Sequence, residues 1–118
     1  IENYDANTGS HIFCDGNVVA YYASDIRLKD NIIKIENPLD KLLKIGGYKF
    51  KWNDKQDIYT GNDIGIVAQE IEEVLPEIVE TRANGYKAVK YEKIVPLLIE
   101  AIKEQQIQID QLKDKING

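Results

Sequence analysis

The chain has 118 residues and a formal net charge of −5, from 15 basic and 20 acidic side chains. A chain of this length forms one small domain with appendages, and an acidic one lacks the basic face that a nucleic-acid groove needs. It has no apolar stretch of about 18 residues and no signal-peptide pattern, so no membrane partner is expected. Association with further copies of itself would add to the modest stability margin of so small a domain.

Cysteine and histidine each occur once, as Cys14 and His11. A single cysteine forms no intrachain disulfide, and neither residue has the neighbours that a zinc site requires. The glycine pairs Gly46-Gly47 and Gly61…Gly65 lack the lysine-serine context of a phosphate loop. No metal and no cofactor is therefore expected.

The composition changes at Ser24. All 15 lysines and arginines lie in residues 25–118, whereas residues 1–24 carry three acids and no basic residue. Residues 10–22 alternate loosely around Asp15-Gly16-Asn17, a pattern that favours a hairpin. We interpret residues 1–23 as the end of an upstream β-rich stalk and residues 24–118 as a separate domain. Because the chain does not begin with Met, we expect it to be a fragment of a longer protein.

The next elements form a mixed α+β pattern with short antiparallel strands. Ile32, Ile33 and Ile35 form a short strand-like run, and Asn37-Pro38 is typical of a helix start, predicting a short helix over 38–45 that ends at Gly46-Gly47. Aromatic and polar residues alternate over 48–53, as in a strand with one buried face. Its antiparallel partner is expected at 64–67, after the loop 54–63.

A helix is predicted over 67–75, because its apolar residues have helical spacing and Pro76 ends the pattern. Asn84-Gly85 lies between residues 78–79 and 86–89, which indicates a second small hairpin.

The C-terminal part, about 91–117, has the clearest pattern of the chain. Starting at Tyr91, seam residues recur at alternating steps of three and four; the seam consists of Val95, Leu98, Ile102, Gln105, Ile109, Leu112 and Ile116. Such a seam predicts a coiled coil with other copies of the same helix. A helix packed along its own domain is the alternative. Ile99 and Ile107 fall off the seam and are expected to pack on the globular part.

Five blocks in order, Ser24–Asn31, Tyr48–Trp52, Gly65–Glu77, Val89–Tyr91 and Leu97–Glu104, resemble the intramolecular chaperone domain at the C-terminus of phage tailspikes, endosialidases and neck appendages. That family is also classed as a self-cleaving peptidase, S74. The resemblance covers about residues 24–112 and implies a trimer. Branched residues at one seam position and leucine at the other favour dimers, but the stalk and globular part would also constrain the number, and Gln105 can set the register.

Ser24 and Lys29 are the candidate catalytic residues. From spacing alone, a Ser-Asp pair is typical of a turn and the lysine of a solvated side chain. The resemblance implies instead that Ser24 is the nucleophile and Lys29 its base, with cleavage at the Ser24-Asp25 bond. A serine-lysine pair needs a neutral amine, which apolar or cationic surroundings favour; Ile26, Leu28 and Arg27 are the neighbours that could supply them. Glu70 is a possible supporting acid that could orient Lys29, or an exposed helical glutamate.

The geometry of the cut leaves several routes open. Attack by Ser24 on its own carbonyl would close a four-membered ring, so cleavage at Ser24-Asp25 requires a serine from another chain, an activated water or assistance from Asp25. A cut at Ala23-Ser24 would suit a direct N-to-O shift.

The leading hypothesis is a self-cleaving intramolecular chaperone. It would form a homotrimer, promote folding of the upstream β-stalk of a phage tail or neck fibre in the host cytoplasm, and then be released from the virion precursor. One alternative is a permanent trimeric foot that is never cleaved. Another is a trimerisation and self-cleavage module of a membrane-tethered transcription factor.

Overall fold

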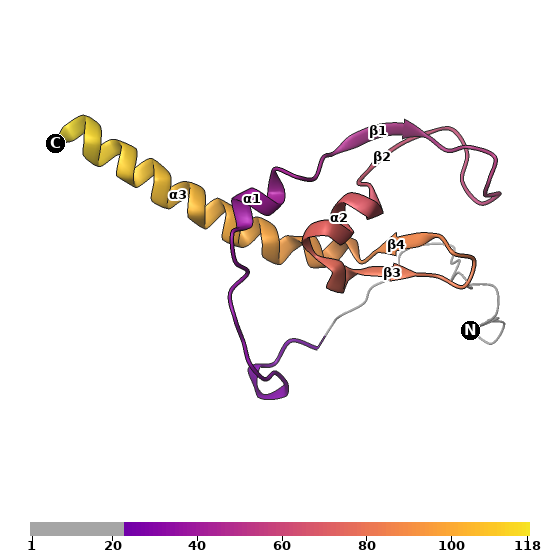
Figure 1. The fold of residues 1–118 in the computed structure, drawn as a ribbon, viewed down its shortest axis with the longest axis horizontal. Coiled ribbons are helices and arrows are strands. Elements are labelled where there is room, and N and C mark those ends of the chain that lie inside the picture. The colour runs from indigo at the N-terminus through magenta and orange to yellow at the C-terminus, as the bar shows by residue number, and fades with distance from the viewer. Residues whose placement is uncertain (1–22) are drawn as a thin grey trace, which may run out of the picture.

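The computed structural model describes residues 23–118, so the predicted hairpin at 10–22, with Cys14 and His11, lies outside the described residues. The other helices and the strands lie beside and beyond the N-terminal half of one long helix (Figure 1). The helices are α1 (Pro38–Leu42), α2 (Ala68–Val74) and α3 (Val95–Asn117). The strands are β1 (Tyr48–Lys51), β2 (Asn62–Gly65), β3 (Val79–Thr81) and β4 (Lys87–Val89), and three short 3-10 turns lie at Ile26–Leu28, Pro76–Ile78 and Tyr91–Ile94. The predicted α+β class is confirmed.

Two antiparallel hairpins carry all the strand pairing in the described part of the chain. β1 pairs with β2, Tyr48 opposite Gly65 and Lys51 opposite Asn62, and β3 pairs with β4, Val79 opposite Val89. Gly85 takes a φ of +87° in the second turn, a conformation that glycine adopts without strain. The two predicted hairpins that lie within the described residues are thus present, with bounds that differ from the predicted ones: β1 ends at 51 rather than 53, and β2 covers 62–65 rather than 64–67.

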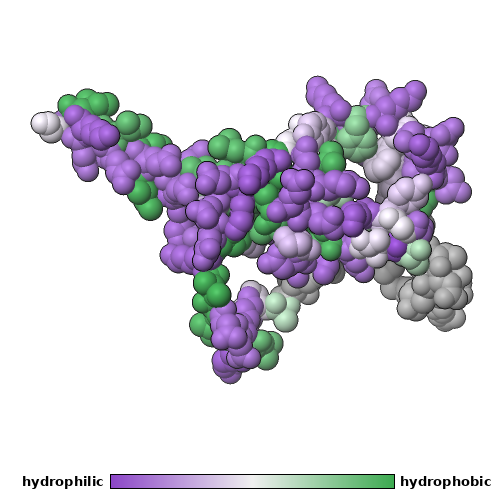
Figure 2. Space-filling view, in the orientation of Figure 1, coloured by the Kyte–Doolittle hydropathy of each residue, from purple (hydrophilic) through white to green (hydrophobic). Residues whose placement is uncertain are grey.

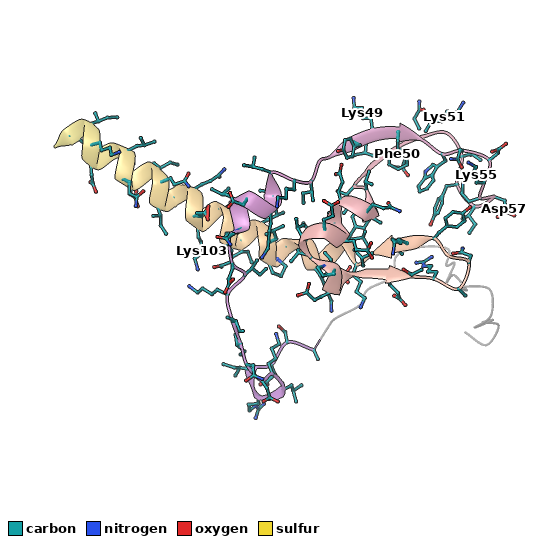
Figure 3. The ribbon with its side chains drawn as sticks, viewed as in Figure 1. Lys49, Phe50, Lys51, Lys55, Asp57 and Lys103 are labelled. Carbon is teal, nitrogen blue, oxygen red and sulfur yellow. The ribbon has the colours of Figure 1, made fainter. Side chains whose placement is uncertain are left out.

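The alternation in β1 places two kinds of side chain on two faces. Figure 3 shows Lys49 and Lys51 on the outer side of the strand and Phe50 on the other. Phe50 packs edge-on against Trp52 with ring centroids 4.9 Å apart, and Trp52 stacks on Tyr59 at 4.8 Å. The predicted aromatic face is only half-buried, since Phe50 and Trp52 are partly accessible and Tyr48 and Tyr59 are exposed.

The core is small and lies where α2 meets the start of α3. It consists of Ile71, Val74, Leu75, Ile78 and Leu97, edged by Ile35, Leu42, Ile45, Ile66, Val79, Val89 and Ile94. Pro76 ends α2 as predicted, because proline lacks the N–H that a continuing helix needs and disfavours helical backbone in the residue before it.

Three predictions about 32–45 need correction. Ile32–Ile35 forms no strand in the described structure, and Ile32 and Ile33 are exposed. Asn37 makes no side-chain cap bond, because it adopts left-handed backbone with φ +49°. The helix ends at Leu42 rather than Ile45, although hydrogen bonds from Lys44 N–H to the Lys41 carbonyl and from Ile45 N–H to the Leu42 carbonyl continue the turn.

The long helix α3 has 23 residues, about 35 Å at 1.5 Å per residue, and starts at Val95, with Pro96 in its first turn. Leu97 and Ala101 are its buried residues, and α1 packs beside them. The expectation that Ile99 and Ile107 are covered by the globular part is not met, since both side chains are at least half exposed. The C-terminal half projects beyond the other elements (Figure 1).

Candidate active site and assembly surface

The turn that contains Ser24 and Lys29 is formed by local hydrogen bonds. Asp25 precedes the 3-10 turn Ile26–Leu28, and its side chain accepts a bond of 2.8 Å from the Arg27 backbone N–H. The Leu28 N–H donates to the Asp25 carbonyl at 3.0 Å, and the Lys29 N–H donates to the Ile26 carbonyl at 3.2 Å. One tight turn therefore separates the serine from the lysine.

This turn brings the two candidate catalytic side chains together. The Lys29 amine, Nζ, donates to the Ser24 hydroxyl, Oγ, at 3.1 Å. That distance is within the range from which an amine, once neutral, could accept the hydroxyl proton.

Arg27 is engaged by Asp25 rather than directed at Lys29. Its Nε and Nη2 donate to the two oxygens of the Asp25 carboxylate at 3.1 and 2.9 Å. The side-chain bonds from Arg27, and then its backbone N–H, lower the pKa of Asp25, and the carboxylate in turn raises the pKa of Arg27. The guanidinium is therefore paired with an anion, which reduces the electrostatic repulsion expected between Arg27 and the Lys29 amine.

The surroundings of the pair are open to solvent in a single chain. Figure 1 shows residues 24–36 as an extended arm that runs away from the body, with the turn at its far end. Ile26 and Leu28, the expected apolar neighbours, are 72% and 73% exposed. Lys29 is likewise exposed to solvent.

Glu70 lies in a different network from Lys29. Its carboxylate accepts bonds from the Gly46 N–H at 3.0 Å and from the Tyr48 hydroxyl at 2.6 Å. The bond to Glu70 raises the pKa of Tyr48. Glu70 thus fastens the start of β1 to α2, a role that sequence reasoning missed because its partners lie 22 and 24 residues away.

A second contact, from the 3-10 turn that precedes α3, supports the same hairpin. The Tyr91 hydroxyl accepts a bond of 3.2 Å from the Ile66 N–H. A Cβ at Gly65 would lie 2.7 Å from that hydroxyl, so glycine is required there for the close approach.

The predicted seam forms one exposed face of α3. Its apolar residues are Val95, Leu98, Ile102, Ile109, Leu112 and Ile116, between 39% and 82% exposed, and Gln105 is exposed among them. Figure 2 shows hydrophobic residues recurring along this projecting helix. An exposed apolar row of this length indicates a surface that associates with another surface.

Residues 23–118 hold no cluster of three or more histidine, cysteine or acidic side chains that could bind a metal. Over the same residues, no helix combines the length and apolar character needed to cross a membrane.

Comparison with known proteins identifies the family of the chain. Residues 24–80 match the peptidase S74 family, described as the chaperone of endosialidase, and the match begins at Ser24. The chain belongs to this family. The resemblance suggested by the five sequence blocks is therefore confirmed.

The similar proteins include long tail fibres of phages. The chain is 38% identical over 104 residues to the long tail fiber protein Gp37 of Enterobacteria phage K3, covering 81% of this chain and 8% of that protein. It is 36% identical over 116 residues to Gp37 of Salmonella phage S16, covering 92% of this chain and 15% of that protein. It is also 30% identical over 114 residues to myelin gene regulatory factor-like A of Dictyostelium discoideum, covering 81% and 12%. The chain thus spans a small part of each relative.

Proposed function

We propose that this chain is the self-cleaving intramolecular chaperone of a phage tail fibre, which assembles three copies of an upstream β-stranded segment and is then released by cleavage at Ser24-Asp25. The exposed seam on α3 is the observation that carries the proposal. The family membership and the Gp37 relatives support it. The virion precursor, in the host cytoplasm, is the expected location.

Association of three α3 helices would bury the seam. Each fully buried Ile, Leu or Val side chain contributes about 1.5–3 kcal/mol, and six apolar seam residues on each chain supply this driving force. Gln105 interrupts the apolar row, and a single polar residue in a seam fixes the register at some cost in stability.

Trimerisation would help the upstream client through effective concentration. Strands from three chains pair slowly, because non-local pairing must first overcome the entropy of bringing distant segments together. Chains held together at one end meet at an effective concentration of up to roughly millimolar. The chaperone thus acts on its own polypeptide.

Cleavage would follow from the Ser24–Lys29 contact. Lys29 takes the hydroxyl proton as the Ser24 oxygen of one chain bonds to the Ser24 carbonyl carbon of another, and the C–N bond to Asp25 breaks. The proton passes to the new amine of Asp25, and water then hydrolyses the ester and restores the serine. This route avoids the four-membered ring, and the Arg27 pairing of Asp25 disfavours assistance by that carboxylate.

Assembly would gate the reaction, because the exposed arm lacks the apolar shell that a neutral lysine needs. Four side chains of the arm, Ile26, Leu28, Ile32 and Ile33, are 65–78% exposed in the single chain. Burial of the arm in the assembled trimer would remove water from Lys29 and stabilise its neutral form.

The test is a chain extended upstream, compared with its Ser24→Ala and Lys29→Ala variants and with Lys34→Ala as a matched control. The wild type and the control are expected to yield two fragments whose masses place the cut, and the other two variants one intact chain. An uncut wild type that sediments as a trimer would refute the peptidase role and leave the permanent foot. A monomer at all concentrations would refute assembly as well.

The similarity to myelin gene regulatory factor-like A supports a second candidate, a trimerisation and self-cleavage module in a regulatory protein. We favour the fibre because the identity to the Gp37 proteins is higher, 36–38% against 30%. The residues upstream of this chain distinguish the two, since a β-stranded fibre and a DNA-binding domain differ in sequence pattern.

A further inference from the structure

Ile99 is a half-exposed apolar residue on α3. It lies one position beyond the seam residue Leu98 and is 50% exposed, although the core begins only two residues earlier, at the fully buried Leu97. Neither the seam nor the core explains why an isoleucine is exposed at this position.

Its position in the heptad is defined by the seam. With Val95 and Ile102 at position a and Leu98 at position d, Ile99 occupies position e and Ile94 the preceding position g. Ile94 has helical backbone, with φ −71° and ψ −28°, so the helical spacing extends to it.

The globular part of the same chain covers only one side of the seam, the side of the g positions. Ala101, also at position g, is 1% exposed beneath the globular part, and Ile94 packs at the edge of the core. The e side, where Ile99 lies, is left uncovered.

Parallel coiled helices place each e residue beside the g residue five positions earlier on the next helix. We propose that Ile99 of each copy packs against Ile94 of the neighbouring copy, so that three equivalent joints connect each helix to the next globular body. The joint rests on the proposed trimerisation and specifies the partner surface as a second copy of this chain.

The remaining e and g positions restrict the joint to the globular end. Further along the helix they hold Gln106, Gln108, Lys113 and Lys115, all polar. An apolar stripe three positions wide is typical of helices in larger bundles, whereas a two-position stripe is typical of a simple coiled-coil seam. The added width at this end therefore favours three helices where the seam residues alone favour two.

The test is disulfide capture in the full chain with Cys14→Ser as background. The pair Ile94→Cys with Ile99→Cys is expected to give covalent trimers after mild oxidation, and neither single variant should do so. The control pair, Ile94→Cys with Ile107→Cys, should remain uncrosslinked, because position 107 faces away from the seam. A trimer by sedimentation that forms no covalent trimer would overturn the joint and leave trimerisation intact, whereas a monomer would overturn both.

A second measurement avoids cysteine geometry. Ile99→Lys is expected to raise the concentration at which the trimer dissociates by at least about tenfold relative to Ile107→Lys, because it removes buried apolar area at three sites. Equal dissociation of the two variants would overturn the joint.

Discussion

Two isoleucines on the same helix offer a direct test of the seam. Ile102 lies in the seam and Ile107 lies off it, yet the two side chains are similarly exposed in the single chain, at 63% and 57%. Substituting either with alanine removes the same atoms and slightly favours the helix. A difference between the variants therefore reports association rather than the stability of one chain.

The expected magnitude follows from the atoms removed. Ile102→Ala deletes three carbons at about 0.8 kcal/mol each, or about 7 kcal/mol over three copies if the side chain is fully buried in the trimer. That loss lowers the trimer association constant by about 10⁵-fold. Because this constant depends on the square of concentration, the dissociation midpoint should rise roughly 300-fold.

Sedimentation equilibrium across a wide concentration range measures this midpoint. Ile107→Ala should dissociate at the same concentration as the wild type, and circular dichroism should show that both variants keep the fold. The seam assignment is wrong if the two variants shift the midpoint equally, or if Ile102→Ala leaves a stable trimer unchanged.

Three further predictions concern the body and the turn. Leu97→Ala should lower the free energy of unfolding by about 2–5 kcal/mol in chemical denaturation, whereas Leu43→Ala, at an 82% exposed position, should change it by less than about 0.5 kcal/mol; similar losses would contradict the core assignment. Glu70 raises the pKa of Tyr48, so their contact stabilises the fold below the ordinary tyrosine pKa of 10.0 and is lost as pH rises above it. As pH rises through this alkaline range, the free energy of unfolding should fall less for Tyr48→Phe than for the wild type. Identical profiles of unfolding free energy against pH would refute the contact. Arg27→Gln should slow self-cleavage by about twofold to fivefold, because it removes an exposed ion pair that supports the turn. If Arg27→Lys restores the wild-type rate, the turn does not require the two-pronged contact that a guanidinium makes.

Short sequence patterns correctly predicted the elements whose conformation depends on residues close together in the chain. Asn84-Gly85 specifies a turn through the positive φ of glycine, Pro76 ends a helix, and the three-four spacing after Tyr91 predicts a long helix. The pairing of Ser24 with Lys29 was implied by the family resemblance rather than by spacing, although the bonds that shape their turn lie within six residues.

The predictions from sequence were wrong where contacts between distant residues, or the lack of a pairing strand, determine the conformation. Ile32 and Ile33 have strand propensity, but a strand forms only with a neighbour that accepts its hydrogen bonds, and the single chain provides none within the described residues. Glu70 resembled a surface helical residue because nothing in the local sequence indicates that Gly46 and Tyr48 lie against it.

Assembly must precede cleavage if the proposed mechanism is to work. A pair that was active in the single chain would release the domain before three upstream segments had met, and the effective concentration on which the client depends would be lost. The arrangement opposes this premature reaction: the nucleophile and its base are already 3.1 Å apart, but they lie on a solvent-exposed arm. Association is left to supply the scissile carbonyl of another chain and the change in environment, and burial of apolar surface can supply the latter as the trimer forms. The cleavage rate of the upstream-extended chain should therefore follow the concentration of trimer, and a rate that is unchanged in the monomeric range would refute this order of events.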